Sequence, residues 1–220
     1  MNLSTLCIIA HVIVTVVHIT IFGTPLVSFL LIYGELVILL NLWISGIISD
    51  ISKSHMTDNI LEQSKMVIEA LKKSSKLFSY NLFWILTLLL CGLIFSTYRS
   101  LSFLLGNYAK NWEYICMSGS FLMISIAYCC IIWYLCHLSQ TLISKTQDLK
   151  VALGTNLRPL RSTPDESSEL EIICNELNDF KGFHGEDFFT VNNSLITGMV
   201  SNFVTYLIIL IEFKITENAK

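Results

Sequence analysis

The sequence predicts an all-α protein, a multi-pass membrane helical bundle with five transmembrane helices, and three observations support this class. Of the 220 residues, 53% are hydrophobic and 14% are charged, and the mean hydropathy is +0.63. Five apolar segments approach or exceed the length of about 20 residues that a helix needs to cross a bilayer. The longer polar stretches between them keep the apolar spacing of amphipathic helices. A soluble globular domain would not have this composition.

The sequence holds no motif of an enzyme or of a cofactor site. It lacks a phosphate-binding loop, a Gly-rich dinucleotide turn, a His-Glu-x-x-His pair and a nucleophile elbow. The seven cysteines follow neither a metal-binding spacing nor a disulfide pattern. With a net charge of −3 and no basic cluster interleaved with aromatic residues, a nucleic-acid partner is not expected. We therefore expect a protein that is not an enzyme and that uses neither a cofactor nor a metal.

The first two predicted spans, residues 6–22 and 26–48, form a hairpin around a Gly-Thr-Pro turn. His11 and His18 are seven residues apart and share a helix face. They either face another helix or hold a metal together with a third ligand that the sequence does not reveal. Glu35 lies near the middle of the second span. A carboxylate there is either functional or hydrogen-bonded to a neighbouring helix.

The next two spans have polar extensions. Residues 50–80 are polar with helical spacing and lead into the third span, residues 81–98. The fourth span, residues 112–136, continues as a polar helix until Gly154. We therefore expect the fourth helix to project well beyond the membrane.

Thr163-Pro164-Asp165-Glu166 predicts the start of a further, amphipathic helix. The threonine can cap it, proline suits the first helical position, and the glutamate occupies the capping-box position. The apolar side chains of this helix lie on one face: Leu170, Ile173, Cys174, Leu177 and Phe180. We expect that face to pack against the projecting fourth helix and against the same region of other subunits.

Charge predicts the orientation. The loops 49–80 and 137–190 carry ten Lys and Arg residues, against four on the opposite side, so both loops are expected in the cytoplasm. The N-terminus is then cytoplasmic and the C-terminus external. The predicted divisions are a transmembrane bundle at 1–136 with a cytoplasmic helical loop at 49–80, a cytoplasmic helical anchor region at 137–190, a final pore-type helix at 191–213, and an external tail at 214–220.

The last apolar segment has one polar stripe. Its polar members recur every three, four or seven residues: Thr190, Ser194, Thr197, Ser201, Thr205 and Glu212. At about 100° per residue they fall within one arc of roughly 80°, which Ile208 interrupts. Something other than lipid must lie against this stripe. Either another helix packs there, since small and hydroxyl side chains allow close approach, or water does.

The end of the chain resembles the signature of insect gustatory receptors. Thr205-Tyr206, five apolar residues and Glu212-Phe213 are similar to the family's Thr-Tyr, five hydrophobic residues, Gln and Phe. The segment upstream is similar to the one that leads into the family's final helix, at Gly185, Phe188, Phe189, Thr190, Asn192 and Leu195. The sequence departs from the family in its glutamate at position 212, and its length is roughly half of what is typical.

The resemblance implies a chemosensory receptor of the plasma membrane, a ligand-gated cation channel assembled as a homo- or hetero-tetramer of related subunits. A small tastant or odorant would open it, and membrane lipid would surround it. The five predicted spans would correspond to the last five of seven. The final helices would line the pore, with candidate pore-lining residues Thr197, Ser201, Thr205, Ile208, Glu212 and Phe213. Glu212 either forms a ring of carboxylates there or meets water at the external interface.

An apolar ligand would be met between spans towards the external side. The candidate lining residues are Tyr33, Phe95, Tyr98, Met117 and Phe121. The alternative function is a truncated, non-conducting membrane protein that associates with full-length receptors or has no function. A fragment of a seven-span G-protein-coupled receptor is a third reading, and its external N-terminus conflicts with the charge distribution.

Overall fold

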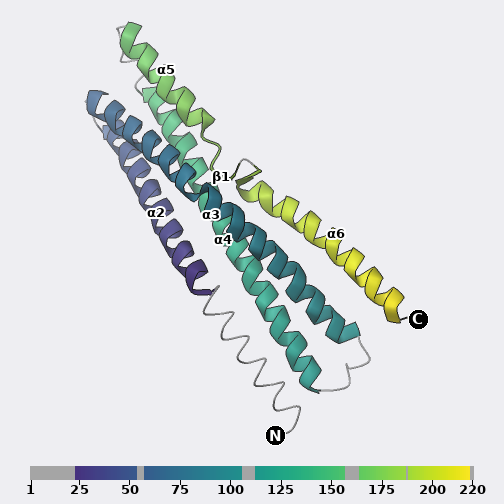
Figure 1. The fold of residues 1–220 in the computed structure, drawn as a ribbon. Coiled ribbons are helices and arrows are strands. Elements are labelled where there is room, and N and C mark those ends of the chain that lie inside the picture. The colour runs from purple at the N-terminus through teal and green to yellow at the C-terminus, as the bar shows by residue number, and fades with distance from the viewer. Residues whose placement is uncertain (1–22, 54–56, 106–111, 157–163, 187, 219–220) are drawn as a thin grey trace.

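The computed structural model describes residues 23–53, 57–105, 112–156, 164–186 and 188–218. Its helices and strands are α2 (Thr24–Lys53), α3 (Thr57–Leu105), α4 (Trp112–Asn156), α5 (Pro164–Asp179), β1 (Phe183–Gly185), β2 (Phe189–Val191) and α6 (Asn193–Asn218). The predicted all-α helical bundle is confirmed (Figure 1).

Four of the described helices are long and apolar enough to cross a membrane. Their candidate spans are Thr24–Lys53, Asn59–Phe103, Ile115–Thr155 and Asn193–Thr216. The chain is therefore a membrane-embedded protein. The predicted span at 6–22, with His11 and His18, lies outside the described residues.

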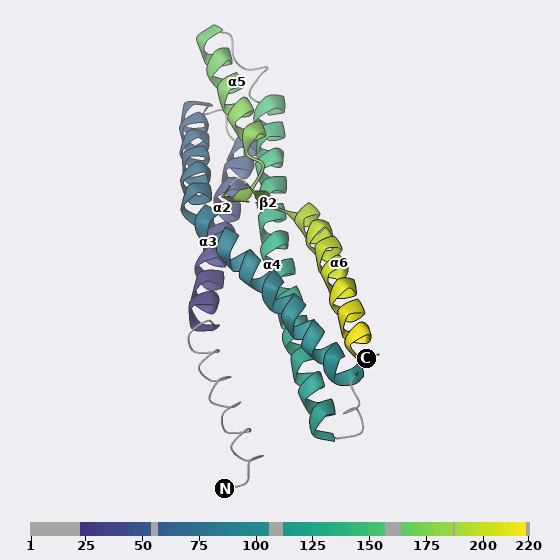
Figure 2. The same ribbon diagram turned by 45° about the vertical axis from the view of Figure 1, so that its right-hand side comes forward.

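α3 and α4 extend well past any bilayer. They have 49 and 45 residues, which at a rise of about 1.5 Å correspond to roughly 74 and 68 Å of helix, against about 30 Å of hydrocarbon. The polar segment before the third predicted span is continuous with it in α3, and the predicted extension of the fourth span is present in α4. Both extensions lie at the end of the bundle that also holds α5 (Figures 1 and 2), which we call the α5 end.

The hydrophobic core is concentrated towards the α5 end. α2 contributes a buried stripe at helical spacing: Tyr33, Val37, Leu40, Ile44, Ile47 and Ile51. α4 contributes leucines seven residues apart, at positions 135, 142 and 149, and each of them is fully buried. The first half of α3 contributes Leu61, Val67, Ile68, Leu71 and Phe78. A seven-residue repeat on a helix places side chains along one seam, as in packed helical bundles.

α2 is displaced along the bundle relative to the spans predicted for α3 and α4. The ring of Tyr33 lies 5.5 Å from that of Phe78, just before the predicted third span. Gly34 faces Tyr134 at the end of the fourth span, and a Cβ there would lie 2.7 Å from the tyrosine hydroxyl. α3 begins four residues after α2 ends, so α2 beyond Tyr33 runs beside the polar first part of α3. The predicted second and third spans are therefore not level with each other.

Hydroxyl groups join α3 and α4 farther from the α5 end. The hydroxyls of Ser96 and Ser125 lie 2.7 Å apart, and those of Ser100 and Ser118 lie 3.0 Å apart. Ser100 and Ser118 also each donate to the other's backbone carbonyl, at 3.0 Å. Such contacts hold membrane helices together, each contributing about 0.6 kcal/mol.

The apolar face of α5 packs against other helices of the same chain. Leu170, Ile173 and Leu177 are buried. Lys65 and Lys72 of α3 form ion pairs with Glu169 and Glu176 of α5, the second at 3.0 Å. Lys150 of α4 donates to Asn178 at 2.8 Å. The packing against α4 is as expected, and contact with other subunits stays a prediction.

Candidate functional site

A short β-hairpin connects the bundle to the last helix. β1 and β2 are antiparallel, with Phe183 opposite Val191, His184 opposite Thr190 and Gly185 opposite Phe189. Three of the residues that resemble the receptor family, Gly185, Phe189 and Thr190, therefore lie in this hairpin, and Phe188 lies in its turn. The sequence indicated only that a helix ends before it. The signal for the strands was short: aromatic and β-branched residues on both sides of a glycine.

Two glycines allow the hairpin to sit tightly on α4 and on itself. Gly182 has a φ of 105°, and a Cβ there would lie 2.7 Å from Cδ1 of Ile143 on α4. At Gly185 a Cβ would lie 2.5 Å from the ring of Phe189 across the hairpin. Neither position accommodates a side chain without movement of its neighbour.

Aromatic rings fix the base of the hairpin. Phe183 is fully buried and contacts Tyr33 at 5.2 Å, with Phe78 and Phe180 each at 6.3 Å between ring centroids. With Phe29, which stacks on Tyr33, these rings form what we call the aromatic junction. It joins α2, α3 and β1, so it ties the hairpin to two helices of the bundle.

The turn of the hairpin rests on α3. The hydroxyl of Ser79 accepts a hydrogen bond from the backbone N–H of Glu186, at 2.9 Å. The rings of Phe188 and Phe189 lie 5.2 and 6.2 Å from that of Phe83. A movement of this part of α3 would therefore displace the segment that leads into α6.

α6 begins at a well-formed cap. The side-chain oxygen of Asn192 accepts hydrogen bonds from the backbone N–H groups of Ser194 and Leu195, at 3.0 and 3.2 Å. An asparagine at this position satisfies donors that a helix start otherwise leaves free. The helix direction is thereby set by the end of β2.

α6 has two different faces. Only 6% of its apolar window is buried, and its half-buried side chains include Leu195, Met199, Phe203 and Leu210. The predicted stripe residues Thr197, Ser201, Thr205 and Glu212 are all exposed. At 3.6 residues per turn, the centres of these two sets lie roughly 180° apart around the helix. The polar stripe therefore faces away from the chain's own bundle, and no described helix of the same chain covers it.

The structure brings five of the six candidate pore-lining residues onto that one exposed face. Ile208 lies within the stripe and is 51% exposed. Thr205 donates to the backbone carbonyl of Ser201 at 2.9 Å, which leaves its oxygen free to accept a further bond. Phe213 follows Glu212 directly and so lies about 100° farther round the helix, outside the stripe.

The candidate ligand-pocket residues do not form one group. Tyr33 belongs to the aromatic junction beside Phe78, whereas Phe95 lies 17 residues farther along α3, a distance of about 25 Å of helix. The displacement of α2 along the bundle is the reason that Tyr33 is separated from the others. Tyr98, Met117 and Phe121 are half-buried on α3 and α4.

Arg99 and Phe103 link the remaining candidates. The Arg99 guanidinium lies over the rings of Phe95 and Phe103, at 5.7 and 5.9 Å from their centroids. Phe103 in turn stacks on Phe121 at 6.0 Å. Arg99 and Phe103 were not among the ligand-pocket residues predicted from the sequence, although the four-residue spacing of 95, 99 and 103 places them on one helix face.

Glu35 is exposed on α2 and forms no hydrogen bond or ion pair with another described residue. In the described segments, no group of three or more His, Cys, Asp and Glu side chains could hold a metal ion.

The features that remain as a candidate site are a capped helix with an outward polar stripe and a hairpin that connects this helix to the bundle. Comparisons with protein-family models and with curated proteins find no match for this chain.

Proposed function

We propose that this chain is a subunit of a chemically gated cation channel of the gustatory-receptor type, located in the plasma membrane. The observation that supports it most is the polar stripe of α6, which faces away from the subunit's own bundle. Within hydrocarbon, the carboxylate of Glu212 and the hydroxyl oxygens that are free to accept a further bond would lack partners, and for the carboxylate the cost is considerable. Gathering the α6 helices of several copies around a central axis gives the stripe water and other stripes as neighbours.

The resemblance supplies the number of subunits, four, and the class of ligand, a small tastant or odorant. The excess of Lys and Arg in the loops 49–80 and 137–190 supports a cytoplasmic location for the α5 end and an external C-terminus. Contacts such as Lys72 with Glu176 support the requirement that both loops lie on one side.

Gating in this proposal runs through α3. A ligand bound near Phe95, Arg99 and Phe121 changes the equilibrium between two arrangements of α3 and α4. Because the turn of the hairpin rests on Phe83, a shift of α3 moves the start of α6. Ile208 then forms a hydrophobic constriction in the closed arrangement, which opens as the helices move outward.

Cysteine accessibility tests the proposal. Thr205→Cys lies on the polar stripe, whereas Phe203→Cys, two residues away, is a matched control on the half-buried face. A charged, membrane-impermeant thiol reagent should block ligand-evoked current through the first variant and leave the second unaffected. Equal effects on both variants, measured against the parent protein, would contradict a pore lined by the stripe.

Co-expression with full-length receptors distinguishes the proposed channel subunit from the alternative, a non-conducting partner. A chain that reaches the surface but carries no current alone, and that alters the current of full-length receptors expressed with it, would be a non-conducting partner. The thiol reagent would then act on Thr205→Cys only when the full-length subunits are present.

A further inference from the structure

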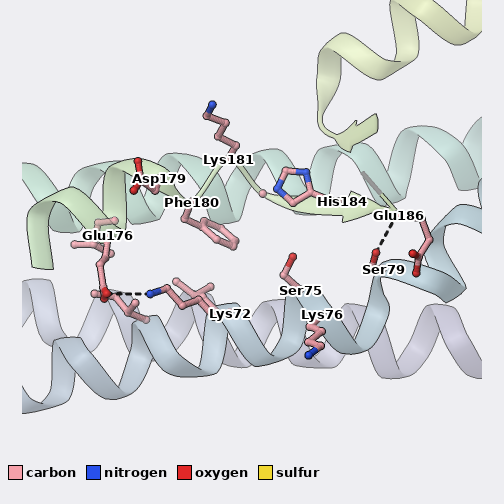
Figure 3. A pocket seen from close by; sticks show the side chains of 14 residues that line it. Lys72, Ser75, Lys76, Ser79, Glu176, Asp179, Phe180, Lys181, His184 and Glu186 are labelled. Atoms are coloured by element: carbon pink, nitrogen blue, oxygen red, sulfur yellow. Dashed lines mark hydrogen bonds and ion pairs between the residues drawn. The ribbon is translucent and has the colours of Figure 1, made fainter. Parts of the chain in front are cut away.

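A cavity of about 550 Å³, lined by apolar as well as polar side chains, lies where α3, the end of α5 and the hairpin meet (Figure 3). Two walls face each other across it. Ser75 of α3 and His184 of β1 point towards one another from these walls, and Phe180 lies beside them. Lys76 and Lys181 belong to opposite walls, and their side chains extend away from the space between the walls (Figure 3).

The charges around the cavity are of both signs. Three lysines line it, Lys72, Lys76 and Lys181, together with three carboxylates, Glu176, Asp179 and Glu186. Lys72 and Glu176 form an ion pair at 3.0 Å, and both side chains are largely in solvent, so the pair is weak and opens easily. Lys76 and Lys181 form no ion pair with a described residue. Their long, flexible side chains can turn towards a ligand in the opening.

The interior groups are held in place by the hairpin. A nitrogen of His184, Nδ1, lies 3.2 Å from the hydroxyl of Thr190 on the neighbouring strand, which leaves the other ring nitrogen available to a ligand. The hydroxyl of Ser79 is engaged by the N–H of Glu186 at 2.9 Å. Ser75 makes no hydrogen bond to another described residue, so its hydroxyl is a free donor inside the cavity.

The cavity opens close to the membrane boundary. α3 changes from polar to apolar just beyond it, where Tyr80 and Trp84 are 59% and 47% exposed and their rings contact at 6.2 Å. Exposed tyrosine and tryptophan at such a boundary are typical of the headgroup level of a bilayer. Lysine side chains at this level attract anionic headgroups.

We propose that this cavity binds a ligand with phosphomonoester groups, either the headgroup of a phosphorylated inositol lipid or a soluble inositol phosphate. Lys76 and Lys181 turn towards the phosphates from the two walls, and Ser75 and His184 donate to them from inside. Two unpaired ammonium groups and a volume much larger than one phosphate favour several phosphate groups over a single phosphodiester. Asp179 and Glu186 equal these two lysines in charge, so binding requires that the ammonium groups lie nearer to the phosphates than the carboxylates do.

A ligand in this position would bridge α3, the end of α5 and β1. It would stabilise the hairpin in its present place, and the hairpin leads directly into α6. The proposal concerns binding and does not depend on whether the chain conducts.

The test uses the full chain in phosphatidylcholine nanodiscs, with binding followed by native mass spectrometry and by the thermal unfolding midpoint. Dioctanoyl phosphatidylinositol bisphosphate should bind and raise the midpoint, whereas dioctanoyl phosphatidylcholine should not. Lys76→Gln with Lys181→Gln should weaken binding at least about tenfold, since hydrogen bonds from charged groups are lost. Ser75→Ala, which removes one neutral donor, should weaken it less and leave the fold intact.

The matched control is Lys53→Gln with Lys73→Gln. It removes the same charge from the same end of the bundle but outside the cavity, and Lys73 is already engaged by Glu69 at 2.6 Å. Affinity should then stay within about twofold, as expected for a small change in overall charge. Equal weakening by both double variants, or no binding of the bisphosphate by folded protein, would overturn the proposal. Competition by soluble inositol trisphosphate would identify the phosphate groups alone as sufficient, and its failure would make the membrane lipid the source.

Discussion

At the scale of single residues, Gly182 is the position where a small change should do most harm. Its φ of 105° costs a side-chain-bearing residue about 1–2 kcal/mol, and a Cβ would also meet Ile143 at 2.7 Å. Gly182→Ala should therefore lower the thermal unfolding midpoint in detergent. Gly119→Ala is the control, because a Cβ there would meet no atom within 4 Å beyond the adjoining turns of its own helix, and alanine favours a helix. A Gly182→Ala protein as stable as the parent would show that the hairpin does not depend on this glycine.

Glu212 is the residue whose charge should matter most for conduction. It is exposed on the outward stripe of α6 and would repeat once per subunit around a shared axis. A ring of carboxylates attracts cations, so Glu212→Gln should lower the cation-over-anion permeability ratio while expression is unchanged. The reversal potential under a salt gradient measures this ratio. Glu171→Gln on α5, also exposed, should have no effect. Identical reversal potentials for the Glu212→Gln variant and the parent protein would mean that Glu212 does not line the conducting path.

Helical spacing in the sequence placed five of the six candidate pore-lining residues on one face of α6, whereas the candidate ligand residues on three different helices were not correctly grouped. The stripe of Thr197, Ser201 and Thr205 follows from helical spacing alone. Tyr33 was grouped with Phe95 because both are aromatic residues in predicted spans. The contacts that separate them depend on how far α2 is shifted along α3, and no local pattern records that shift.

At the scale of elements, the packing of α5 is open to a direct test. Leu177 is 2% exposed on the face that meets the rest of the chain, whereas Ile172 is 56% exposed. Leu177→Asp should destabilise the fold by at least the ~2–5 kcal/mol of a buried Leu→Ala change, because a charge also loses water. Ile172→Asp should have little effect on the unfolding midpoint. The reverse order of effects would mean that α5 packs through its other face.

The same pair of variants shows where subunits meet. If the exposed side of α5 contacts another copy, Ile172→Asp should reduce oligomer recovery in mild detergent without lowering the unfolding midpoint. Unchanged recovery would exclude that side of α5 from assembly.

The sequence predicted the long helices well because amphipathic spacing and span length are strong local signals. It predicted the start of α5 equally well from the Thr-Pro-Asp-Glu cap. The β-hairpin was missed, since each strand has only three residues and needs the bundle to form. Its stability comes from Phe183 in the aromatic junction, which is a tertiary contact.

At the scale of the whole molecule, the buried core and the proposed pore helix belong to different parts of the chain. The buried core lies mainly at the α5 end, where α2, α3, α4 and α5 pack together, whereas α6 contributes little to it. A helix with so little burial can change position at small cost to the fold. The hairpin is the connection through which the stable part restrains it.

The orientation of the bundle is the last prediction. Ser168 on α5 and Thr216 near the end of α6 are both exposed, and α6 crosses the bilayer between them if it is a span. The ten-to-four distribution of Lys and Arg predicts that Ser168 lies in the cytoplasm and Thr216 outside. On intact cells, an impermeant maleimide should label Thr216→Cys above the parent protein and should reach Ser168→Cys only after permeabilisation. Labelling of Ser168→Cys alone would mean that the protein has the opposite orientation in the membrane, contrary to the positive-inside rule. Labelling of both would mean that α6 lies on one side of the membrane, where its outward stripe could not line a pore.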